Sequence, residues 1–183
     1  KMLIELIKRV KICRNENTSV SASSALSLFI TNNFSARDLN KNPKLFQAFM
    51  ELDDNDIWGA IKYWLNHEDP VIKILSRALR DRKLFKIDII KKPLKTTQLT
   101  ALKKKAAKKL KLRLEMTESL ITQGSVTNEA YTARNQSISI LRKNGKVEEI
   151  TAAVDLPNIK VMSKIVKKNY LCYPKNISLT KYL

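Results

Sequence analysis

The stretch from Glu51 to Ile90 constrains the fold most, because the spacing of its apolar residues changes within it. Up to Arg82 the apolar residues recur every three or four positions, a period typical of two amphipathic helices, with a break at Asn66–Pro70. From Leu84 to Ile89 they alternate with other residues, as in a β-strand. The order helix, turn, helix, strand predicts an α+β chain that is predominantly helical.

The same patterns place further elements along the chain. Helix caps and breaks are expected where Asp, Ser or Asn precedes an apolar run and where Pro stands in a first turn. Helices are predicted at Lys1–Arg14, at Ser21–Phe34, from Pro43 onward, from Asp53 or Asp54 to Leu65, from Asp69 onward and within Lys91–Arg113, with a loop at Ser35–Asn42.

Beyond the basic segment the chain takes on β character. Asn144-Gly145 between Ser137–Lys143 and Lys146–Ile150 predicts an antiparallel hairpin with a type I′ turn. A short helix at Asp155–Ser163, a last strand at Ile165–Tyr173 and a surface tail at Lys175–Leu183 are also expected. We therefore predict a helical region over residues 1–92 and a small α+β module over residues 93–183.

Several classes of protein are excluded by motifs that the sequence lacks. Neither GxGxxG nor GxxxxGK[ST] occurs, and every apolar run is too short to cross a membrane. Cys13 and Cys172 are too few for a disulfide scaffold and are interpreted as reduced thiols of a cytoplasmic protein. The chain also starts inside a helical pattern, so we expect a preceding part of the protein.

The charge makes polyanions the expected partners. The 183 residues include 35 Lys and Arg against 17 Asp and Glu, a net charge of +18. Ten of the basic residues fall in Lys91–Arg113, which has no acidic and no aromatic residue. A solvated helix face is the favoured interpretation of this segment, and a freestanding nucleic-acid-binding module is the alternative.

No residue stands out as catalytic or as a metal ligand. His67 is the single histidine, so a His-based metal site is excluded within this segment, and Asp53–Asp56 is better explained as a helix cap than as a cation site. Trp58 and Trp64 are expected to be core or interface anchors. A basic cluster where a helix becomes a strand could grip a phosphate or stabilise the helix dipole; it comprises Arg77, Arg80, Arg82, Lys83 and Lys86.

Three segments resemble one family. The stretch LDDNDIWGAIKYWLNHEDPVIKILSRALRDRKLFK is similar to the region after the catalytic core of HD-domain phosphohydrolases of the deoxynucleoside triphosphate triphosphohydrolase group, with R-x-L-[FY]-K at Arg82 to Lys86 as its most specific element. The first helix and the segment from Ile138 to Lys175 also resemble bacterial members. The resemblance implies that the helical region continues an HD-type all-α domain.

The resemblance also implies which reaction the whole protein performs and which part of it performs that reaction. Such enzymes hold a divalent metal with an H…HD…D set and cleave a dNTP into nucleoside and triphosphate. That set is absent here, so this segment alone is expected to be inactive, with no catalytic residue, and the metal is expected in the missing HD core. The implied role is oligomerisation, as dimer or tetramer, and nucleotide sensing.

One site is implied residue by residue. In the vertebrate SAM-and-HD-domain member, the Arg and Lys of this element contact nucleotide at an allosteric site between subunits. Arg82 and Lys86 are the corresponding nucleotide-binding candidates here. The expected partners are thus nucleotides, a second subunit, the HD core and, at Lys91–Arg113, nucleic acid. No membrane partner is expected.

Overall fold

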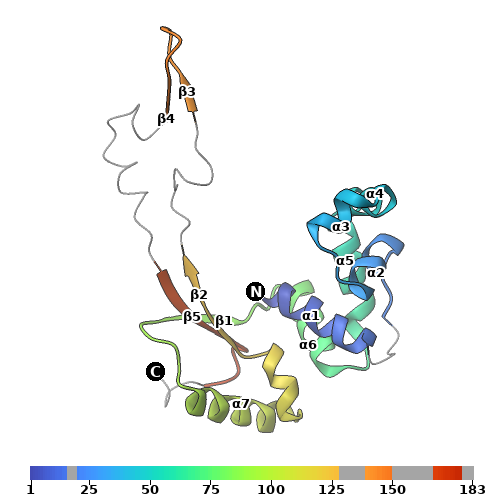
Figure 1. Cartoon of the computed structure of the whole chain (residues 1–183). Coiled ribbons are helices and arrows are strands. Elements are labelled where there is room, and N and C mark those ends of the chain that lie inside the picture. Colours follow the sequence, from blue (N-terminus) through green and yellow to red (C-terminus); the bar gives the residue numbers. More distant parts are fainter. Residues whose placement is uncertain (16–19, 128–138, 150–166, 179–183) are drawn as a thin grey trace. The chain divides into compact units, whose positions relative to one another are not determined.

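A computed structural model describes residues 1–15, 20–127, 139–149 and 167–178 (Figure 1). Helices dominate the N-terminal part and short strands follow, which confirms the α+β, predominantly helical fold. In chain order the elements are α1 (Met2–Asn15), α2 (Ser24–Thr31), α3 (Ala36–Lys41), α4 (Pro43–Met50), α5 (Asp54–Tyr63), the 3₁₀ turn η1 (Trp64–Asn66), α6 (Pro70–Arg80), β1 (Lys86–Ile90), α7 (Thr96–Leu110), the 3₁₀ turn η2 (Leu114–Ser119), β2 (Thr122–Thr127), β3 (Ser139–Leu141), β4 (Val147–Glu149) and β5 (Lys167–Tyr173).

Side-chain caps explain where the helices begin. Asp53 accepts hydrogen bonds from the backbone N–H groups of Asn55 and Asp56, so α5 starts at the capping acid that the sequence predicts. Asp69 caps α6 in the same way, and Pro70 occupies the first helical position.

The predicted loop at Ser35–Asn42 is wrong, because the chain forms helix α3 there. Ser35 and Asp38 form a reciprocal capping box: the Ser35 hydroxyl accepts from the Asp38 N–H, and the Asp38 carboxylate accepts from the Ser35 N–H at 2.7 Å. These bonds satisfy backbone donors at the start of a helix that buries none of its residues.

The helical core is built around α1 and α6, which pack against each other (Figure 1). Trp64 is its largest buried side chain, at 1% exposure, and its indole Nε1 donates to the Ser21 carbonyl at 2.9 Å. Trp64 is therefore an anchor of this chain's own core, whereas Trp58 is 49% exposed. The other members of the core cluster are Met2, Leu6, Val10, Cys13, Leu26, Ile30, Ala60, Ile61, Val71, Ile72, Leu75 and Leu120.

An ion pair joins α1 to the start of α6. The Arg9 guanidinium donates to Asp69 Oδ2 from Nε at 3.0 Å and from Nη2 at 2.5 Å, and the two side chains are 12% and 8% exposed. Burial alone would raise the pKa of Asp69. The hydrogen bonds from Arg9 and from the Ile72 and Val71 N–H groups outweigh burial, so the pKa is lowered.

The strands form two small sheets. One has the order β1-β5-β2, and β2 was not predicted from the sequence. In the other, β3 and β4 pair antiparallel with Ile140 opposite Glu148, which confirms the hairpin. Its turn is not type I′, because only Gly145 has a positive φ, of 82°. The Gly145 N–H donates to the Arg142 carbonyl, and Gly145 supplies the left-handed position that returns the chain.

The chain divides into two compact units, made up of residues 1–88, 94–122 and 171–183, and of residues 89–93 and 123–170. Within the second unit, Gly124 leaves room for Tyr170, whose Oη would stand 2.7 Å from an added Cβ. The boundary at 92/93 stays a prediction, and the expected helix at Asp155–Ser163 lies outside the described residues. No described helix is both long and apolar enough to cross a membrane.

Candidate anion-binding site

The end of α6 places Arg82 in an unusual backbone conformation. The Asp81 N–H donates to the Arg77 carbonyl, and the Arg82 N–H donates to the Leu79 carbonyl, so the last turn closes on itself. Arg82 then adopts a φ of 54°, in the left-handed region that costs a non-glycine residue on the order of 1 kcal/mol. Glycine is the residue that usually ends a helix this way, and Lys111 ends α7 in the same conformation with a φ of 55°.

Arg82 lies on the rim of a cavity of about 580 Å³ within the first unit. Three cations line the cavity, and no acidic residue does. The remaining lining side chains are mostly apolar and come from α6, from the segment between α6 and β1, from the end of α7 and from the segment after β5. The lining residues are Ile74, Arg82, Lys83, Phe85, Leu110, Pro174, Lys175 and Asn176.

The third cation, Lys175, reaches the cavity because the segment after β5 is tied to α7. Lys109 donates to the Asn176 carbonyl, and Lys105 donates to the Ser178 carbonyl at 2.8 Å. Ile177 is buried at 2% exposure, and its N–H donates to the Pro174 carbonyl. Of the expected surface tail, Lys175, Asn176 and Ser178 are exposed and Ile177 is the buried exception, whereas residues 179–183 lie outside the described part.

The cavity has the chemistry of a site for an anion that carries an apolar body. Arg82, Lys83 and Lys175 are exposed, and none of their side chains has a hydrogen bond or ion pair within the described ranges. A guanidinium offers a planar fork of donors, and lysines offer mobile point charges. Phe85 and the other apolar residues of the lining provide a surface for a ring or an aliphatic group.

Lys86, the second predicted contact, does not line this cavity. Its ammonium lies 3.0 Å from Asp88 Oδ1 and 5.8 Å from the centroid of the Tyr173 ring, and Tyr173 donates to Asp88 Oδ2 at 2.6 Å. Hydrogen bonding to Asp88, then to Tyr173, raises the pKa of Lys86. Lys86 is therefore held by β1 and β5, and would have to leave Asp88 to reach a phosphate.

The rest of the basic cluster is engaged elsewhere. Arg77 donates to the Leu65 carbonyl at 2.9 Å and to Asn66 Oδ1 at 2.8 Å, which fixes the turn before α6. Arg80 pairs with Asp81 at 2.6 Å. Of the five clustered cations, Arg82 and Lys83 are the two that the structure brings together at the cavity. Lys175 and Asn176 carried no signal in the sequence, because nothing local links them to Arg82.

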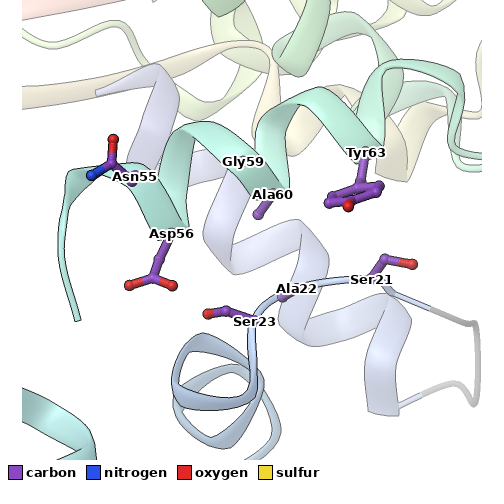
Figure 2. Close-up of a pocket in the computed structure, with 8 residues that line it drawn as sticks. All are labelled: Ser21, Ala22, Ser23, Asn55, Asp56, Gly59, Ala60 and Tyr63. Carbon is purple, nitrogen blue, oxygen red and sulfur yellow. The ribbon is translucent and has the colours of Figure 1, made fainter. Parts of the chain in front are cut away.

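A second hollow, of about 550 Å³, lies between α5 and the segment before α2, and Figure 2 shows its lining residues. Three of its polar side chains already serve the helix starts. Asp56 accepts from the Asp53 N–H at 2.9 Å, Ser23 accepts from the Leu26 N–H, and Asn55 donates to Asp53. The hollow also lacks a cation, so we assign it a structural role in helix capping.

A metal does not fit the described residues. No three His, Cys, Asp or Glu side chains come together there as ligands would. His67 Nδ1 accepts from the Asp69 N–H at 3.0 Å, and Asp53 is used as a helix cap. Cys13 and Cys172 are buried, and burial raises the pKa of the Cys172 thiol, which makes it a poor nucleophile.

Comparison with solved structures finds a phosphohydrolase from Bacteroides thetaiotaomicron VPI-5482. The match covers 94% of this chain, with a TM-score of 0.76 and 34% sequence identity. It covers 43% of the phosphohydrolase chain, so this chain spans less than half the length of that protein. No protein-family model and no curated protein matches the sequence. The chain therefore resembles part of a phosphohydrolase.

Proposed function

We propose that this chain is the assembly and nucleotide-sensing portion of an HD-type phosphohydrolase that converts a dNTP into nucleoside and triphosphate. The match to part of a phosphohydrolase over nearly all of the chain carries this proposal. The R-x-L-F-K element at Arg82 to Lys86 supports the narrower group. In this proposal the divalent metal and its ligands belong to the catalytic core, outside these residues.

The Arg82 cavity is the proposed nucleotide site. Its lining offers three cations for phosphate oxygens and an apolar wall for the base. Lys86 would join the site only when a phosphate competes with Asp88 for its ammonium.

Binding of each dNTP to the intact protein, measured by calorimetry with Arg82→Gly and Arg80→Ala beside it, tests the site. Arg82→Gly relieves the left-handed strain while it removes the guanidinium, so we expect stability to be kept or raised as affinity falls. Loss of hydrogen bonds to a charged group corresponds to roughly a ten- to hundred-fold weaker Kd. Arg80, which is already paired with Asp81, is the matched control and should leave affinity unchanged. Equal affinity in wild type and Arg82→Gly would place the nucleotide elsewhere.

The reaction is tested separately from the site. Release of inorganic triphosphate from each dNTP by the intact protein, with Mg²⁺ or Mn²⁺, is the expected activity. This 183-residue chain alone serves as the control and should release none. Absence of triphosphate release with every dNTP would reject the substrate and leave only the relation to phosphohydrolases.

Assembly is the remaining part of the proposal. Phe46 and Phe49 on α4 are 48% and 47% exposed, and the Phe49 ring lies 6.1 Å from that of Phe29. Exposed aromatic groups of this kind are typical anchors of subunit contacts. Light scattering of the intact protein should show a dimer or tetramer that Phe46→Ser with Phe49→Ser dissociates. An unchanged mass would exclude α4 from the subunit contact.

A further inference from the structure

The lysines of α7 fall into two sets that the sequence does not distinguish. Lys103 pairs with Glu118 at 2.5 Å, and Lys105 and Lys109 donate to the carbonyls of Ser178 and Asn176. These three lysines hold neighbouring segments of the first unit against the helix. The side chains of Lys104 and Lys108 are exposed and form no hydrogen bond or ion pair with any residue that the structure describes.

The two unengaged lysines lie on one stripe of the helix. Thr97, Ala101, Lys104 and Lys108 follow one another at spacings of four, three and four residues, which keeps them on a single face. Lys111 continues this spacing at the C-cap of α7, where its backbone is left-handed. Lys111, just past the end of α7, is likewise exposed and without a partner in the described segments. Leu102 and Ala106, both fully buried, lie on the opposite face.

The N-terminal half of this stripe is concave. A shallow hollow of about 340 Å³ is lined by Thr96, Thr97, Thr100, Ala101 and Lys104. Small and hydroxyl-bearing side chains there allow a partner to approach the helix closely, and threonine hydroxyls donate readily to phosphate oxygens. The stripe thus runs from the threonine-lined hollow to the three ammonium groups of Lys104, Lys108 and Lys111.

Charge on the stripe is uncompensated. Lys104 and Lys108 are like charges four residues apart, an arrangement that destabilises an isolated helix by about 0.2–0.5 kcal/mol. A polyanion would remove this repulsion and release its own condensed counterions. The chain as a whole carries +18, so its field also attracts such a partner.

The composition of the stripe selects the partner. An interfacial membrane helix needs large apolar or aromatic anchors beside its lysines, and the stripe has none. Base stacking needs aromatic side chains, which α7 lacks. We propose that the stripe of Thr97, Ala101, Lys104, Lys108 and Lys111 binds the sugar-phosphate backbone of nucleic acid without sequence preference. This goes beyond the proposed function and does not depend on it.

Fluorescence anisotropy of the intact protein with a labelled oligonucleotide, single-stranded and duplex, from 50 to 200 mM salt, tests the proposal. Lys104→Gln with Lys108→Gln should weaken binding and make the slope of log K against log salt shallower by about 1.4–1.8, the value for two phosphate contacts. Different base sequences should bind with equal affinity. The helix itself should be retained, as judged by circular dichroism.

Two control pairs remove the same charge. Lys105→Gln with Lys109→Gln removes lysines of α7 that are already engaged, and Lys44→Gln with Lys62→Gln removes exposed lysines of α4 and α5. Both pairs should keep the wild-type salt slope. The second pair cannot disturb α7, so it remains informative if the first one loosens the segment after β5.

Three results would overturn the proposal. An equal loss of affinity in the Lys44/Lys62 pair would mean that net charge alone attracts the oligonucleotide. An unchanged slope in the Lys104/Lys108 pair would place the contact elsewhere, and tighter binding to phosphatidylserine vesicles than to oligonucleotide would assign the stripe to a membrane. Arg82→Gly should leave oligonucleotide binding intact, so failure of the nucleotide site and failure of this surface are distinguished.

Discussion

Asp69→Asn is the substitution that best tests how the helical core is held together. Asparagine keeps an oxygen that can cap α6 through the Val71 and Ile72 N–H groups. It removes the charge that faces Arg9, whose side chain is 12% exposed. While that oxygen caps α6, the NH₂ group of the asparagine takes the place of Oδ2 and offers the Arg9 guanidinium no acceptor.

The expected cost follows from this geometry. Removing one partner of a buried pair costs about 3–5 kcal/mol, and retention of the cap places Asp69→Asn near 3 kcal/mol. Asp69→Ala also loses the cap, which adds about 1 kcal/mol. Glu68→Gln is the control, because this neighbouring carboxylate is exposed and unpaired within the described residues, and its effect should stay within 0.5 kcal/mol.

The same pair predicts a dependence on pH. The pKa of Asp69 is lower in the folded chain than its ordinary value of 3.8, so the folded state gains stability above about pH 4 and loses it as the pH falls through the folded pKa. Urea unfolding followed by circular dichroism should therefore show a gap between wild type and Asp69→Asn that is full at pH 7 and narrows below pH 4. A gap under 1 kcal/mol at pH 7, or one that does not change with pH, would refute the reasoning.

Two further predictions concern aromatic residues. Trp64→Phe strands the Ser21 carbonyl and leaves a void in the core, so it should cost about 2–3 kcal/mol in urea unfolding, whereas Trp58→Phe should cost under 0.5 kcal/mol. A larger loss of stability in Trp58→Phe than in Trp64→Phe would contradict the described core. Burial, then the hydrogen bond to Asp88, raises the pKa of Tyr173. Ultraviolet titration should therefore show a phenol that ionises above pH 10 in the wild type and is missing in Tyr173→Phe. If the phenol lost in Tyr173→Phe ionises at the ordinary pKa of 10.0, the described burial and hydrogen bond of Tyr173 are contradicted.

Local chemistry explains why much of the fold was predictable. Asp53 and Asp69 start helices through bonds to residues two and three positions away, and the alternation from Leu84 to Ile89 is a property of one strand. The missed helix α3 and the wrong turn type are also local features. Each depends on which of two alternative local hydrogen-bonding patterns is the more stable. Ser35 with Asp38 formed a capping box rather than a loop, and Asn144 did not adopt the positive φ that type I′ requires.

The candidate site was predictable only in part. Sequence resemblance singled out Arg82 and Lys86, and the structure places them in different surroundings, one on a cavity rim and one on Asp88. Lys175 joins Arg82 across the sequence because Lys109 and Lys105 hold its segment on α7. No periodicity or motif reports such a contact, since it depends on two elements meeting in space.

The sequence by itself determined the starts of α5 and α6, the change from helix to strand after Arg82, the hairpin and the amphipathic basic helix. Each of these features depends on neighbours within a few residues. Only the tertiary structure decided which lysines of α7 are engaged, that Trp64 belongs to the chain's own core, and that Arg9 meets Asp69. Those outcomes depend on packing between segments far apart in the chain. The burial of a side chain and the compensation of its charge there depend on both of the segments that meet.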